Sequence, residues 1–145
     1  MTEDTTVRIE RVVDASPADV FRAWTTPTAM EQWYRDGDDF TVRVVELDLC
    51  VGGRYRVEFG PTGQDPYVEH GEYVEIQPPH RLVWTETLDG VDAPWSDTQV
   101  MLELREDNGK TRLTLTHTGF PTSSHRDVAA GGWPGFLDRI DSLLT

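Results

Sequence analysis

Residues 95–118 read WSDTQVMLELREDNGKTRLTLTHT, and this stretch decides the fold. Asn108-Gly109 favours a tight hairpin turn, because both residues tolerate positive φ. If Asp107 and Lys110 flank the turn as a pair, the leucines of both flanking strands fall on one face of a sheet. The opposed pairs would then be Leu104 with Leu113, Leu102 with Leu115, and Val100 with His117.

Alternating apolar residues predict further strands on the N-terminal side of this hairpin. Residues 68–88 form a second hairpin, in which two strand-like runs flank a pair of prolines. Pairing Ile76 with Leu82 sets its register. The opposed pairs would be Val74 with Trp84 and Glu72 with Glu86. The expected strands are residues 7–13, 44–51, 54–59, 68–76, 82–88, 95–106 and 111–118.

Helical patterns stand on both sides of the sheet region. Residues 16–19 (Ser-Pro-Ala-Asp) open a first helix, since serine caps a helix N-terminus and proline suits its first position. Residues 28–33 predict a second, short helix. Residues 124–144 carry an apolar stripe with the 3–4 spacing of a long helix, which Pro134 should weaken near Trp133.

This order predicts an α+β fold with a curved antiparallel sheet of about seven strands around a long C-terminal helix, and two short helices after the first strand. The chain of 145 residues has no repeat, low-complexity segment or linker. We therefore expect one domain over residues 6–144. A curled sheet that does not collapse fully onto its helix leaves a cavity, where small apolar ligands bind.

The predicted cavity has candidate lining residues on both of its walls. Trp84 and Trp133 point into the gap, where each is either core filling or part of a pocket wall. A gap filled by indole rings would leave no room for a ligand. The candidate ligand-binding residues are Trp33, Tyr55, Val57, Glu72, Trp84, Glu86, Leu102, His117, Trp133 and Phe136.

Some of these residues carry acid–base chemistry. If Glu72 and Glu86 are opposed and buried, their charges repel, so one keeps its proton and suits general acid–base catalysis or the anchoring of a hydroxyl or amine. Together with His117 they are the candidate catalytic residues. In the alternative interpretation both carboxylates lie in solvent at the cavity mouth beside Arg54 or Arg56, and the histidine is a satisfied core residue.

The acidic composition narrows the range of partners. Asp and Glu number 26 against 13 Lys and Arg, a formal net charge of −13, so nucleic acid and anionic membranes would be repelled. The lone cysteine and the lack of zinc-type spacing predict no metal site, and no cofactor is expected. Residues 1–6 are polar, unlike a signal peptide, and no apolar run reaches the ~20 residues of a membrane span, so we expect a cytoplasmic protein. The sequence leaves a homodimer open.

Several motifs together resemble a known superfamily. They are SPADVFRAW at residues 16–24 with Trp33-Tyr34 after it, DLCVGGRY at 48–55, GEYVEIQPPHRLVW at 71–84, and Gly132-Trp133 followed by Leu137. The chain resembles the START-like, SRPBCC helix-grip proteins, and within them the family related to the activator domain of the heat-shock-ninety chaperone ATPase. The resemblance covers nearly the whole chain and implies a seven-stranded antiparallel sheet gripping a C-terminal helix over a hydrophobic cavity. Members of the superfamily include ligand carriers, cyclases and hydrolases, with no shared catalytic set.

Three functions follow from these patterns. We favour binding of a small hydrophobic or aromatic molecule in the cavity between the sheet and the C-terminal helix. An acid–base enzyme of the cyclase, aromatase or hydrolase kind, using the pocket carboxylates, is the first alternative. A chaperone-regulating interaction module is the second, and it would need an exposed apolar or strongly charged patch.

Overall fold

The computed structural model describes residues 4–35 and 37–145. Residues 1–3, which belong to the segment that we distinguished from a signal peptide, lie outside the described residues. The elements follow the expected order of one strand, two short helices, six strands and a long helix. Their bounds are β1 Val7–Val13, α1 Pro17–Thr25, α2 Pro27–Trp33, β2 Phe40–Leu47, β3 Arg54–Pro61, β4 Tyr67–Gln77, β5 Arg81–Asp89, β6 Trp95–Asp107, β7 Lys110–Thr118 and α3 Ser123–Leu144.

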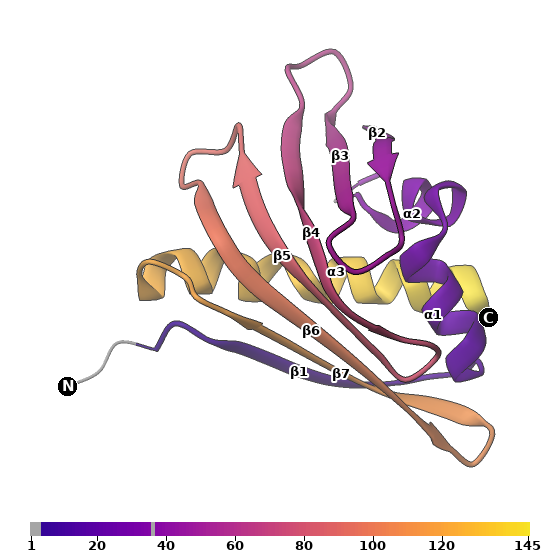
Figure 1. Ribbon diagram of the computed structural model, residues 1–145. Coiled ribbons are helices and arrows are strands. Elements are labelled where there is room, and N and C mark those ends of the chain that lie inside the picture. The colour runs from indigo at the N-terminus through magenta and orange to yellow at the C-terminus, as the bar shows by residue number, and fades with distance from the viewer. Residues whose placement is uncertain (1–3, 36) are drawn as a thin grey trace.

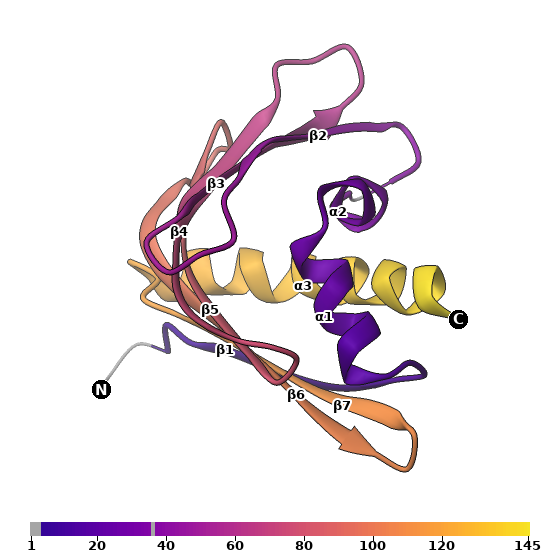
Figure 2. The ribbon, with the colours of Figure 1, turned by 45° about the vertical axis from the view of Figure 1, so that its right-hand side comes forward.

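The strands form one curved antiparallel sheet that wraps around α3. Over the described ranges the sheet has seven strands in the order β1-β7-β6-β5-β4-β3-β2. The long helix crosses its concave face, and α1 and α2 lie near the C-terminal end of that helix (Figures 1 and 2). The α+β helix-grip fold expected from the sequence is therefore confirmed.

The register of the β6–β7 hairpin is as predicted. Val100 pairs with His117, and Asp107 pairs with Lys110 across the turn. Asn108 and Gly109 have φ angles of 52° and 82°, the left-handed conformations that such a turn requires. The pair of Val100 and His117 belongs to a row of opposed residues that crosses the buried inner face of the sheet, in the order Tyr73, Trp84, Val100, His117 and Val7.

The β4–β5 hairpin departs from its predicted register. Ile76 pairs with Leu82 as expected, but a β-bulge lies between Tyr73 and Glu75. A bulge adds one residue to one strand, so every side chain beyond it changes face. Trp84 consequently opposes Tyr73 and not Val74. The prediction that Glu72 faces inward is wrong for the same reason.

Most elements begin and end within one or two residues of the expected bounds, and β2 departs furthest. Strand β2 occupies Phe40–Leu47 and not residues 44–51. Helix α3 is capped by Thr122, whose side chain accepts a hydrogen bond from the backbone N–H of His125. The helix continues through Pro134 to Leu144, because its apolar stripe packs into the sheet and offsets the missing N–H. Within the described residues, no helix is long and apolar enough to span a bilayer.

Candidate functional site

A cavity of about 380 Å³ lies between the sheet and the first half of α3. Its size falls within the range of small-molecule sites, about 300–1,000 Å³. Aromatic residues supply much of its wall, and Glu69 and Glu86 supply carboxyl groups from neighbouring strands β4 and β5. The residues lining it are Tyr34, Phe40, Phe59, Tyr67, Glu69, Glu86, Leu88, Val91, Trp95, Val128, Ala129, Gly131, Gly132, Trp133 and Phe136.

The other end of the gap between sheet and helices is filled by side chains. Trp24 packs against Trp33 with ring centroids 4.7 Å apart, and against Trp84 at 5.6 Å. The indole Nε1 of Trp33 donates to the carbonyl of Ala23 over 2.8 Å. A void of only about 20 Å³ remains among these rings. The tryptophans therefore fill the core near α1 and α2 and leave the larger cavity beside the first half of α3.

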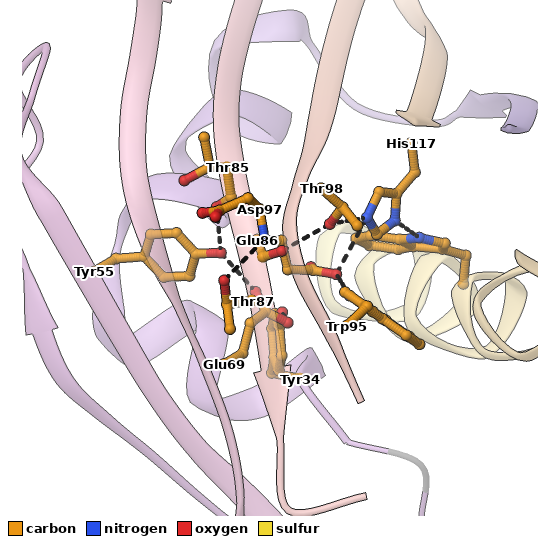
Figure 3. A network of polar contacts seen from close by, with 11 residues as sticks. Tyr34, Tyr55, Glu69, Thr85, Glu86, Thr87, Trp95, Asp97, Thr98 and His117 are labelled. Atoms are coloured by element: carbon orange, nitrogen blue, oxygen red, sulfur yellow. Dashed lines mark hydrogen bonds and ion pairs between the residues drawn. The ribbon is translucent and has the colours of Figure 1, made fainter. Parts of the chain in front are cut away.

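Glu69 is held at the cavity by two tyrosines. It is buried on β4, where it accepts hydrogen bonds from the hydroxyls of Tyr34, at the end of α2, and of Tyr55 on β3, the latter over 3.1 Å (Figure 3). Tyr55 pairs with Gly71, where a Cβ would lie 2.0 Å from the carbonyl oxygen of Thr85. Position 71 therefore requires a glycine. The Tyr55 phenol passes β4 at this position, and the Tyr55 hydroxyl lies 3.0 Å from the carbonyl oxygen of Thr85.

Glu86 is the second buried carboxyl group of the cavity. The indole N–H of Trp95 donates to its Oε2 over 3.1 Å, and His117 Nε2 lies 3.3 Å from the same oxygen. Burial and then the charge of Glu69 raise the pKa of Glu86 well above the usual glutamate value. Burial raises the pKa of Glu69 as well, but the hydrogen bonds from its tyrosines act in the opposite direction. The pKa of Glu86 is therefore raised further than that of Glu69, and Glu86 is the member of the pair that keeps its proton to higher pH.

Buried hydrogen bonds fix the tautomer of His117. Trp133 Nε1–H donates to His117 Nδ1 over 3.1 Å, and because an indole nitrogen only donates, the ring proton lies on Nε2. Thr98 Oγ1 is 2.8 Å from Nε2 and 2.7 Å from the Glu86 carbonyl oxygen, so it accepts from the histidine and donates to the carbonyl. Burial lowers the pKa of His117 to about 3, so the ring is neutral near neutral pH.

The sequence profile described as "Activator of Hsp90 ATPase homolog 1-like protein" matches residues 14–145. The chain belongs to this family. The match covers most of the helix-grip fold, from the end of β1 to the end of α3. A search of the curated proteins found no match.

Solved structures support the AHSA1-like fold over almost the whole chain. Protein CV1439 from Chromobacterium violaceum has a TM-score of 0.86 and 29% identity, with 97% of this chain and 96% of that chain covered. Protein Ms6760 from Mycobacterium smegmatis has a TM-score of 0.82 and 20% identity, covering 99% and 94%. An AHSA1-like protein from Aeromonas hydrophila has a TM-score of 0.77 and 21% identity, covering 94% and 90%. The last two likenesses concern the fold alone.

The candidate ligand-binding residues that the sequence predicted lie in different parts of this AHSA1-like structure. Glu86, Trp133 and Phe136 line the cavity. His117 is fully buried behind Trp133 and contacts Glu86. The remaining inward residues lie in the filled core or around the small void, and they are Trp33, Tyr55, Val57, Trp84 and Leu102.

Glu72 lies on the outer face, away from the other candidates. Its side chain is 53% exposed, and Arg54 Nε lies 3.9 Å from its Oε1. The alternative interpretation is right that Glu72 is solvated beside Arg54, but Glu72 lies on the outer face and not at the cavity mouth. It is wrong for Glu86, which is 3% exposed. Among the residues that the structure describes, no group of three or more His, Cys, Asp or Glu side chains is placed to hold a metal ion.

Sequence reasoning missed Glu69 as the partner of Glu86. The bulge beside Tyr73 puts Glu69 on the inner face, and no periodic pattern in the sequence shows a bulge. Trp95 reaches Glu86 because the β5–β6 pairing is irregular between Glu86 and Leu88. Asp97 in this irregular segment has a φ of 54°, and its backbone N–H donates to the hydroxyl of Thr87.

Proposed function

We propose that this protein binds a small hydrophobic or aromatic molecule in the cavity between the sheet and α3. The observation that carries the proposal is a cavity of about 380 Å³ with an aromatic wall and two carboxyl groups. Small-molecule sites are concave and mostly apolar, with a few polar groups that orient the ligand. Phe59, Trp133 and Phe136 supply the apolar contact, and Glu69 and Glu86 supply the polar groups.

Two glycines of α3 give a matched test. Gly132 borders the cavity one turn before Phe136, and a Cβ built there meets no atom within 4 Å. Gly135 is likewise exposed and free of neighbours within 4 Å, but it does not line the cavity. Gly132→Leu and Gly135→Leu should both favour the helix, by slightly less than the about 0.8–1 kcal/mol that separates glycine from alanine. Only the first places a side chain in the cavity.

Isothermal titration with a panel of naphthalene, indole and tetralin derivatives is the assay. We expect wild-type protein and Gly135→Leu to bind members of the panel alike, and Gly132→Leu to lose at least about tenfold in affinity, because one side chain then takes the ligand's place. Failure of the whole panel to bind wild-type protein would count against the proposal. Equal binding by both leucine variants would place the ligand elsewhere.

The buried carboxyl pair favours a second candidate, proton transfer on the bound molecule. The pKa of Glu86 is raised further than that of its neighbour Glu69, and two carboxyl groups with different pKa values have the split acid–base character that such catalysis uses. Deuterium uptake at the carbon next to the carbonyl of 2-tetralone, followed by NMR, measures this chemistry. We expect wild-type protein to accelerate the uptake and Glu86→Gln to abolish the acceleration. Uptake at the buffer rate would dispose of this candidate.

A further inference from the structure

The buried carboxyl pair has no basic partner among the described residues of the cavity wall. Glu69 and Glu86 are only 5% and 3% exposed, and the described residues that line the cavity include no lysine, arginine or histidine. His117 touches Glu86, but its Nδ1 accepts from Trp133 and its ring is neutral. The hydrogen bonds from Tyr34 and Tyr55 orient Glu69 without neutralising it.

The other titratable groups around the pair do not supply a buried positive charge. His70 follows Glu69 in β4, but it is exposed and lies 3.4 Å from Asp89. Tyr73, on the inner face of β4, has a pKa that is raised by burial and by the charge of Glu69. A buried charge without a counter-ion is costly. The titratable groups near the pair are Tyr34 after α2, Tyr55 on β3, Tyr73 on β4 and His117 on β7, with His70 on the opposite face of β4.

The wall around the pair is built from aromatic rings. Tyr34 lies 5.1 Å from Phe59 and 5.0 Å from Phe136 between ring centroids, and Trp133 lies 6.0 Å from Phe136. All four residues line the cavity that contains both carboxyl groups. The faces of aromatic rings attract cations, and a nearby carboxylate adds charge-assisted hydrogen bonds. An aromatic enclosure around two carboxyl groups that have no basic neighbour in the wall is thus suited to an organic cation, which would supply the positive charge that favours ionisation of the pair.

We propose that the ligand of this cavity is a small organic cation, with an apolar or aromatic body and one ammonium group that pairs with Glu69 and Glu86. This inference rests on the proposed function and names its ligand class. The ammonium group acts as the counter-ion that the protein itself does not provide, and the apolar body lies against Phe136 and Trp133. Anionic molecules are disfavoured, because the described lining offers them two carboxyl groups and no basic side chain.

Three probes with one common body separate this inference from the proposed function. They are 1-naphthylmethylamine, which is a cation at neutral pH, the neutral 1-naphthalenemethanol, and the anionic 1-naphthoate. Titration calorimetry should show the amine binding at least about tenfold tighter than the alcohol, with the naphthoate weakest. The preference should survive ~0.5 M salt, which screens the exposed surface charges but not a buried pair.

Glutamine variants assign the preference to the pair. Glu69→Gln and the double variant with Glu86→Gln should lose the preference for the amine while still binding the alcohol, which also shows that they fold. Glu72→Gln is the matched control, because it removes an exposed carboxylate from the outer face of the same strand. It should keep the preference.

Each remaining outcome overturns a defined part of the reasoning. Equal binding of the amine and the alcohol refutes the inference but leaves the proposed function in place. If the preference for the amine disappears at high salt, it comes from the net charge of −13 and not from the buried pair, and the inference is refuted. If the preference persists in the double variant, the amine binds at another site, and the inference is refuted as well. If none of the three probes binds, the inference fails together with the proposed function for this probe class.

Discussion

Replacing Glu86 by glutamine should change how the stability of the protein depends on pH. The amide has the shape of the protonated carboxyl group and can still accept the hydrogen bond from Trp95. In the wild-type protein the native pKa of Glu86 is raised above the value of 4.5 that the unfolded chain has. Above that pH the unfolded state has lost its proton and the native state keeps it, so wild-type stability falls as the pH rises.

The expected magnitude follows from the one proton involved. Each pH unit between 4.5 and the native pKa of Glu86 should cost the wild-type protein about 1.4 kcal/mol relative to the variant. His117 titrates in both proteins, so its contribution cancels in the difference. The advantage of the variant should therefore grow with pH and then level off where the native carboxyl group ionises.

Urea denaturation followed by tryptophan fluorescence measures this difference. Free energies of unfolding for both proteins at four pH values from about 5 to 8 give the slope directly. Glu72→Gln serves as the control, because its exposed carboxylate should produce no comparable slope. A difference between the Glu86 variant and wild type that stays constant over this range, or that shrinks with pH, would refute the raised native pKa of Glu86.

Two further substitutions test the surroundings of the site. The folded pKa of His117 is about 3, so wild-type stability should fall on acidification below 6.5. In the same urea titrations, His117→Gln should gain about 1.4 kcal/mol over wild type for each pH unit down to 4.5. Parallel pH profiles of the two proteins would contradict this. Gly71→Ala places a Cβ 2.0 Å from the backbone oxygen of Thr85, so we expect a loss of about 2 kcal/mol or more in thermal or urea unfolding, whereas the open position Gly131→Ala should lose nothing.

Patterns that repeat along the chain made the fold predictable. The turn at Asn108-Gly109 fixed a register that needed no correction, and Val100 does face His117. The apolar stripe of α3 placed Trp133 and Phe136 at the cavity. These features depend on local turn chemistry and on periodicity, and both are visible in the sequence.

The polar half of the site could not be predicted in the same way. Pairing Ile76 with Leu82 is correct, but the bulge at Val74 exchanges the two faces of β4 beyond it. Glu69 consequently takes the inner position that was expected of Glu72. Bulges depend on tertiary packing, here including the tight approach of Gly71 to Thr85, and they leave no periodic trace.

The bulge at Val74 also has a consequence for engineering this scaffold. It reverses the alternation of inward and outward side chains along β4, so odd-numbered residues face inward before the bulge and even-numbered residues face inward after it. Deleting one residue at the bulge would restore one regular alternation along the strand. Glu69 would then face outward, and its outward-facing neighbours in β4 would turn toward the cavity. A substitution in β4 that is copied from a related protein will therefore reach the intended face only if the two sequences are first aligned at the bulge.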